Sequence, residues 1–207
     1  MNTHAARLLE PDGHLRVTPG ARGIIANGVA MHSGLPQGLS DGADNRAQAV
    51  DGTWFRSVLG HFATGVVAIT AIDPDSGEPC GLAANSFTSV SLDPPLVAFC
   101  VAHTSTSWPR LRAAKSQTVN VLAEHQEAVC AALASRGGTK FAGLTWTDSP
   151  GGSPVIDEAL AWIDCTIEAE YPAGDHVIVV ARVHQLGLHG DGGPLLFFRG
   201  GYGRFRS

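Results

Sequence analysis

Apolar residues in this chain gather in short runs that clusters of Gly, Pro, Asp and Ser separate. Runs of this length, rich in Val, Ile and Phe, are typical of half-buried or buried strands. We expect strands at 66–72, 80–84, 86–92, 96–102, 117–122, 159–171, 176–188 and 195–199. Helical patterns are fewer: a short helix that Thr53 caps and Gly65 ends, and helices over 106–114 and 126–135.

The order of these elements predicts the fold class. Strands outnumber helices, and they do not alternate with helices as a doubly wound parallel sheet requires. The sequence therefore predicts a mainly β protein, an antiparallel β-barrel with a few peripheral helices.

The first 50 residues differ from the rest in composition. They contain no Phe, Trp or Tyr, and they are rich in Gly. Because such a segment can bury little apolar surface, it does not readily offset the entropy cost of ordering. We expect residues 1–50 to form a flexible N-terminal extension and residues 51–207 to form a single folded domain.

Charge and cysteine usage exclude several classes of function. The formal net charge is −5, so the chain has no excess of basic residues for nucleic acid or anionic lipid. No signal peptide or membrane-spanning run is evident, which favours a soluble, cytoplasmic protein. The four cysteines form no CxxC pair, so no metal is expected, and Cys100 and Cys165 are predicted to be buried reduced thiols.

The most informative motif lies between two predicted strands and includes Ala84, Asn85, Ser86, Phe87 and Thr88. It combines small residues with hydroxyl and amide groups. Small side chains let a flat ring system approach the backbone, while Asn, Ser and Thr supply hydrogen bonds to its carbonyls and nitrogens. A polar face on an edge strand would have the same composition.

Two further motifs carry small or hydroxyl residues at element boundaries. Thr64-Gly65-Val66-Val67 stands where a helix gives way to a strand, and glycine there permits close approach of a ligand. Ser105-Thr106-Ser107 precedes a helix, where free N–H groups favour an anion such as a phosphate, and Lys140 is a candidate to add positive charge. A helix stop, ordinary N-capping and a surface lysine are the plain alternatives.

The fourth motif is Gly174-Asp175-His176, in a turn between two long predicted strands. Gly and Asp favour the turn, which sets His176 at the start of a strand near the rim of the barrel. There the imidazole is placed to hydrogen-bond a nicotinamide amide or a dinucleotide phosphate. A surface histidine is the plain alternative.

Taken together and in order, these motifs resemble the flavin reductase family with the FMN-binding split-barrel fold. The resemblance covers Thr53 to Phe205. It is carried by FATGVVAIT, GLAANSFTSVSLDPPLVAFCV, TSTSW, VNVLAEHQ, KFAGLTW, SPVIDEALAWIDCTIEAEY, GDHVIVVARV and PLLFFRGGYGRF. Several of these segments look most like reductase components of two-component aromatic hydroxylases.

The resemblance implies a homodimeric split barrel that binds FMN or FAD, uses NADH or NADPH, and supplies reduced flavin to a separate monooxygenase. It implies hydride transfer from nicotinamide C4 to flavin N5. The implied flavin contacts are Thr64–Val67, Ala84–Thr88 and Ser105–Ser107, with Lys140 near the phosphate and Arg199 and Tyr202 at the border of the site. Gly174, Asp175 and His176 match the family's nucleotide-binding motif, with His176 as the candidate catalytic residue that positions the nicotinamide.

Two other functions remain open from the sequence. One is a flavin-binding barrel without reductase turnover, such as a redox sensor or carrier. The other is an enzyme like pyridoxamine-phosphate oxidase, which holds its flavin tightly. The first alternative differs from a reductase in needing no nucleotide-binding turn. The second differs in that the protein should be yellow when purified, because its flavin stays bound.

Overall fold

A computed structural model describes residues 50–137 and 139–205, so the predicted extension lies outside the described residues except for Val50. Three helices are present in the described part: α1 (Gly52–Leu59), α2 (Trp108–Ala113) and α3 (Glu127–Ala134). The described strands are β1 (Thr64–Gly65), β2 (Val67–Ile72), β3 (Pro79–Ala84), β4 (Thr88–Leu92), β5 (Pro95–Ala102), β6 (Gln117–Val121), β7 (Trp146–Asp148), β8 (Pro154–Ile156), β9 (Ala161–Ala173), β10 (His176–Leu188), β11 (Leu195–Phe198) and β12 (Gly201–Arg204).

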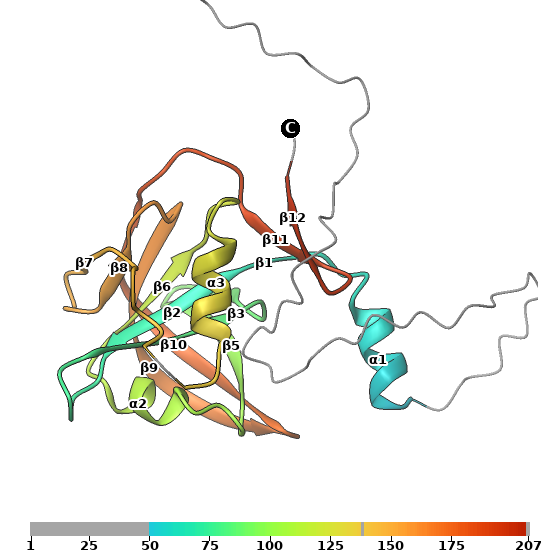
Figure 1. Cartoon of the computed structure of the whole chain (residues 1–207). Coiled ribbons are helices and arrows are strands. Elements are labelled where there is room, and N and C mark those ends of the chain that lie inside the picture. Colours follow the sequence, from blue (N-terminus) through green and yellow to red (C-terminus); the bar gives the residue numbers. More distant parts are fainter. Residues whose placement is uncertain (1–49, 138, 206–207) are drawn as a thin grey trace, which may run out of the picture.

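Seven strands form one antiparallel sheet in the order β3-β2-β6-β9-β10-β5-β4 (Figure 1). The sheet curls until β3, at one edge, approaches β5 near the other edge. A small sheet of β1, β11 and β12 adjoins this barrel, and β7 pairs with β8. The predicted mainly β, antiparallel fold with few helices is confirmed.

Two apolar cores stabilise this arrangement. Alternate residues of the large sheet, among them Ile69, Phe99 and Val179, point into the barrel and are almost completely buried. A second core lies where α3 packs on the sheet and on the β11–β12 hairpin, and it includes Leu133, Leu195 and Tyr202. Burial of these side chains is the main favourable contribution to folding.

The first helix departs from the prediction at both ends. Asp51, not Thr53, is the N-cap, because its carboxylate accepts hydrogen bonds from Thr53 N and Trp54 N at 2.8 and 2.7 Å. The helix ends at Gly60 rather than at Gly65. Figure 1 shows α1 standing away from the barrel, and among the described residues none of its side chains is buried.

Gly187 in β10 packs against the indole of Trp162 on the neighbouring strand. A Cβ at this position would lie 2.8 Å from Trp162 Nε1 and 2.9 Å from Cε2. We expect Gly187→Ala to lower the free energy of unfolding by about 1 to 3 kcal/mol, because overpacking against a rigid ring forces the strands apart. Chemical denaturation measures this change. Gly192→Ala is the matched control, since its Cβ meets Leu160 at an ordinary 3.7 Å and should cost little.

Candidate functional site

The segment that follows β3 closes the barrel. β3 and β4 lie at opposite edges of the large sheet, and residues 85–87 connect them. Ser86 Oγ accepts a hydrogen bond from Cys100 N at 2.9 Å and donates to Cys100 O at 3.3 Å. One hydroxyl thus joins the connecting segment to β5, and we refer to residues 85–87 together with Cys100 as the seam.

The residues around the seam expose little side chain. Ala84 is completely buried in the barrel core, so it can meet a ligand only through its backbone. Phe87 packs against the same core and anchors the segment. Asn85 is half-buried, and Thr88 is exposed with its hydroxyl donating to Ser89 O at 3.2 Å. The backbone is therefore the main group that this segment leaves for a ligand to contact.

The second motif lies beside the first, because Val67 of β2 pairs with Ala84 of β3. The residues of this motif differ in which side chains and backbone groups remain available to a ligand. Val66 and Val67 are buried, and Val66 uses its N–H on Leu195 O and its C=O on Leu122 N. Both valines are therefore structural, since their side chains and the Val66 polar groups are engaged.

Thr64 and Gly65 retain binding capacity. A Cβ on Gly65 would meet no atom within 4 Å, so space is open beside this backbone. Thr64 Oγ1 is buried and finds no hydrogen-bond partner among the described residues. A buried hydroxyl left without a partner carries a free-energy cost that a ligand acceptor can remove after a small movement. These two positions therefore leave space and a hydroxyl for a ligand.

The turn that carries His176 meets the motif that follows β5. His103 N donates to Asp175 O at 3.0 Å, and His176 pairs in register with Ala102. Ser105 N in turn donates to Ala102 O at 2.9 Å. Two motifs that lie about 70 residues apart in the sequence therefore form one rim, and Cys100 of the seam is only two residues from it.

Within this rim, Asp175 fixes the imidazole. Gly174 adopts a φ of +66°, which a glycine tolerates without strain, and this sets the turn. Asp175 Oδ1 lies 2.6 Å from His176 Nδ1, and this hydrogen bond with His176 lowers the pKa of the Asp175 carboxyl. With Nδ1 engaged by the carboxylate, the tautomer and orientation of the ring are set.

The hydroxyl motif supplies side chains of different exposure. Ser107 is buried, Ser105 is half-buried and Thr106 is exposed. Ser107 occupies the N-cap of α2 without a side-chain capping bond. Because α2 has only six residues, hydroxyl and backbone groups of the turn matter more here than any helix dipole.

Two predicted contacts are tied to α3 instead of the seam. Lys140 Nζ donates to Leu133 O at 2.7 Å, at the C-terminal end of that helix, and burial lowers the pKa of the Lys140 ammonium. The Tyr202 hydroxyl lies 3.2 Å from Cys130 Sγ, and burial raises the pKa of that phenol. Tyr202 is only 4% exposed, so its ring contributes to the second core and we omit it from the flavin contacts.

The cysteines, the potential metal ligands and the lengths of the helices restrict what the described part of the chain can do. All four cysteines are free, and Cys165 is buried as predicted, whereas Cys100 is half-buried, contrary to prediction, because its side chain points out of the barrel. No cluster of three potential metal ligands occurs in 50–137 or 139–205. Within the same residues, none of the helices is both long and apolar enough to span a bilayer.

Comparison with known proteins assigns this barrel to a class. The flavin reductase-like domain family matches residues 59–206. A flavin reductase from Pseudomonas putida is 50% identical over 77% of this chain and 93% of its own length. The reductase subunit HsaB of a flavin-dependent monooxygenase from Rhodococcus jostii is 48% identical over 75% of this chain and 79% of its own length.

A solved structure leads to the same class. The NADH:FAD oxidoreductase SgcE6 of Streptomyces globisporus superposes with a TM-score of 0.70 at 36% identity, covering 78% of this chain and 98% of that one. The mainly β barrel and these relatives thus define a flavin reductase. The chain belongs to the flavin reductase-like domain family, as its motifs suggested.

Proposed function

We propose that this flavin reductase oxidises NADH, passes the electrons to FMN or FAD, and supplies the reduced flavin to a separate monooxygenase as one half of a two-component system. We further propose that it works as a homodimer. The observation that carries the proposal is the seam, where the small-residue segment, β5 and the His176 rim meet. The relatives named as a reductase subunit and an NADH:FAD oxidoreductase support it.

The proposed flavin contacts follow from what each residue leaves available. Thr64 and Gly65 border one edge of the ring, and the backbone of 84–88 borders its face. Ser105, Thr106 and Ser107 bind the phosphate, and Lys140, whose Nζ also donates to Leu133 O, adds positive charge near it. Val66, Val67 and Phe87 hold these segments in position from the core.

The reductase needs no side chain that acts as a strong nucleophile or base. Bound flavin supplies the acceptor atom, N5, for hydride from nicotinamide C4. Backbone N–H groups of Asn85 and Ser86 stabilise negative charge on the reduced ring. His176, fixed by Asp175, hydrogen-bonds the nucleotide and holds the nicotinamide against the ring, which makes the transfer effectively intramolecular.

Consumption of NADH and NADPH with each flavin tests this proposal. We expect NADH oxidation, followed at 340 nm on the order of minutes, to require added FMN or FAD, and reduced flavin to accumulate without oxygen. Tight flavin binding without nucleotide oxidation would instead favour the sensor or carrier alternative. Oxidation of pyridoxamine phosphate would favour the other alternative, and either result would overturn the proposal.

The open space beside Gly65 provides a sharper test of the flavin position. Since a Cβ here meets nothing within 4 Å, Gly65→Val should fold with an unchanged melting temperature. If the flavin occupies that space, the added side chain excludes it, and we expect flavin affinity to fall at least about tenfold, or about 1.4 kcal/mol. Fluorescence titration measures the affinity. Gly192→Val is the control, and equal affinities for the two variants would remove Gly65 from the site.

A further inference from the structure

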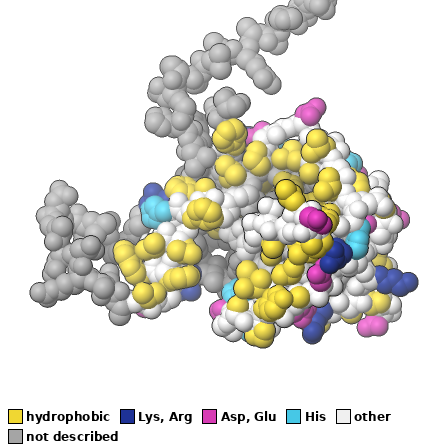
Figure 2. Space-filling view, turned by 180° about the vertical axis from the view of Figure 1, so that it is seen from behind, with side chains coloured by type: hydrophobic (Ala, Val, Ile, Leu, Met, Phe, Trp, Pro, Cys, Tyr) yellow, Lys and Arg dark blue, Asp and Glu magenta, His cyan; other side chains and the backbone are white. Residues whose placement is uncertain are grey.

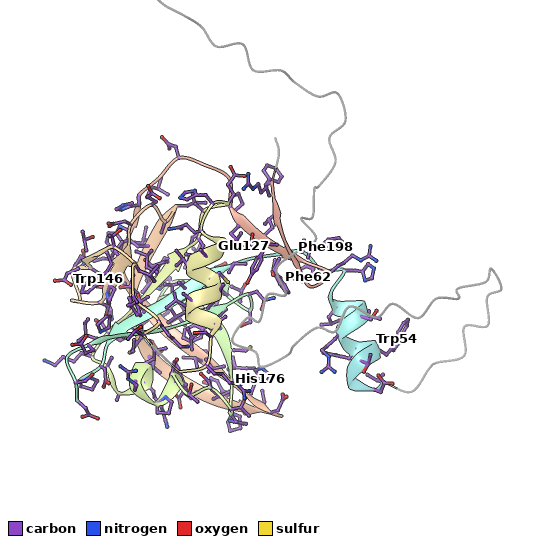
Figure 3. The ribbon with its side chains drawn as sticks, in the orientation of Figure 1. Trp54, Phe62, Glu127, Trp146, His176 and Phe198 are labelled. Carbon is purple, nitrogen blue, oxygen red and sulfur yellow. The ribbon has the colours of Figure 1, made fainter. Side chains whose placement is uncertain are left out.

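Two basic side chains lie at the end of the barrel where α2 packs beside the turn between β2 and β3 (Figure 1). Arg110 belongs to α2 and Lys140 follows α3, and we call them the basic pair. Figure 3 shows His176 at this same end of the molecule. On the face in Figure 2, acidic and basic side chains are interspersed without a broad basic area. Since the net charge is −5, attraction for an anion must arise locally.

Arg110 is held in one orientation. Its Nε donates to Asp73 Oδ2 at 2.7 Å, and Ser76 Oγ donates to the same oxygen at 2.9 Å. Asp75 N donates to the other carboxylate oxygen at 3.2 Å, and the Asp73 side chain is only 9% exposed. Leu111, the next residue of α2, is completely buried in the barrel core, so the helix itself is fixed. The guanidinium is therefore positioned before any ligand arrives.

This ion pair leaves most of the guanidinium available. Within residues 50–137 and 139–205, neither terminal nitrogen of Arg110, Nη1 or Nη2, makes a hydrogen bond, and the side chain is 46% exposed. The N–H groups of a guanidinium form a planar fork that matches two oxygens of a phosphate. Arg110 can therefore bind an oxyanion while its Nε stays on Asp73.

Lys140 brings a second positive charge without an acidic partner. Its Nζ donates to the carbonyl oxygen of Leu133 at 2.7 Å, and it forms no salt bridge with the part of the chain that the structure describes. Burial lowers the pKa of the Lys140 ammonium, and the nearby positive charge of Arg110 lowers it further. The two cations thus share the single carboxylate of Asp73, so a bound anion would be stabilised between them.

The position of the basic pair identifies the anion. Ser107, the last residue of the motif that we assign to the flavin phosphate, precedes Arg110 by three residues at the start of α2. Residues so spaced are neighbours on a helix, with about 5 to 6 Å between their Cβ atoms. FMN ends at that phosphate, whereas FAD continues with a second phosphate and an adenosine. His176, which we assign to the nucleotide, pairs with Ala102, on the other side of the hydroxyl motif from Arg110.

We propose that Arg110, together with Lys140, binds the second phosphate of FAD and makes this protein prefer FAD to FMN. The inference rests on the reductase function and the flavin position proposed above, and it chooses between the two flavins. Since the added contact is between charges, raised salt should weaken FAD binding more than FMN binding.

Fluorescence titration with each flavin, on the full-length chain and without nucleotide, tests this preference. We expect the wild type to bind FAD at least about tenfold more tightly than FMN. Arg110→Gln should raise the Kd for FAD about tenfold and the Kd for FMN less than about twofold. Arg112→Gln is the matched control. It removes a cation from the same helix, one that pairs with Glu170 at 2.9 Å, and it should leave both Kd values unchanged.

Two further variants separate phosphate binding from a structural effect. Arg110→Gln leaves the carboxylate of Asp73 without its cation, so the double variant Asp73→Asn/Arg110→Gln removes that charge as well. We expect the double variant to lose as much FAD affinity as Arg110→Gln does. Arg110→Lys keeps the charge without the planar fork, and it should recover only part of the loss. Full recovery of FAD affinity in the double variant would overturn the proposal, because the loss would then come from Asp73.

The remaining outcomes distinguish this inference from the reductase function. A wild type with equal affinity for FAD and FMN, or equal rises of both Kd values in Arg110→Gln, would overturn the inference and leave the reductase intact. If Arg110→Gln raised only the KM for NADPH relative to that for NADH, the basic pair would bind the 2′-phosphate of NADPH and the FAD assignment would be wrong. An FAD preference that depends on Arg110, in a protein that oxidises no NADH, would contradict the reductase proposal alone.

Discussion

His176→Ala is expected to raise the KM for NADH by about 10- to 100-fold while the KM for flavin changes less than about twofold. The imidazole stands on the rim formed by the 174–176 turn and the residues after β5, with Nδ1 held 2.6 Å from Asp175. Nε2 is then the ring atom that we assign to the nucleotide. With Nδ1–H given to Asp175, Nε2 accepts a hydrogen bond, so its partner is the nicotinamide amide N–H. Leaving that donor unpaired costs about 1 to 3 kcal/mol, and each 1.4 kcal/mol is a tenfold change.

Steady-state kinetics with one substrate varied at a time measures this difference. Asp175→Asn is the matched variant: it keeps the shape of the turn but removes the negative charge that orients the ring, so a smaller rise in the same KM is expected. Since the side chain of Asp175 is 92% exposed, this substitution should leave the melting temperature unchanged. Equal rises in both KM values would remove His176 from nucleotide binding.

Local sequence patterns were sufficient to predict most of the helices and strands. The limits of β10 agree with the prediction because its apolar run starts directly after a turn. The N-cap of α1 was wrong because Asp51 precedes the apolar pattern by more residues than expected. β12 was missed because its glycines hide the strand pattern, and Arg199 and Gly200, with φ of 49° and 80°, form the tight turn before it.

The arrangement of the site was harder to predict from the sequence, because it depends on pairing between segments that are distant along the chain. Composition identified the rim motifs one by one, but only strand register shows that His176 faces Ala102. Neither spacing nor composition could show that Val66 is fully engaged by Leu195 and Leu122. The burial of Tyr202 in the second core could not be predicted for the same reason. Its neighbour Cys130 comes from α3, and the sequence does not show where that helix packs.

Ser86→Ala is expected to lower the free energy of unfolding by about 1 to 3 kcal/mol and to weaken flavin binding about tenfold or more. The Ser86 hydroxyl accepts a hydrogen bond from Cys100 N and donates one to Cys100 O. These two hydrogen bonds join the connecting segment to β5. Without it, the half-buried Cys100 N–H loses its acceptor, and a donor left unsatisfied carries its desolvation cost. The segment is also freed to move, so ligand binding must then order it again.

Chemical denaturation and flavin titration on the same preparations separate the two effects. Ser86→Thr keeps the hydroxyl and should recover most of both losses, whereas Ser89→Ala, at an exposed position on β4, should cause neither. A loss of stability with unchanged flavin affinity would mean that Ser86 closes the barrel without shaping the flavin site. The flavin would then have to lie nearer to Gly65 than to the seam, and Gly65→Val would be the variant that still excludes it.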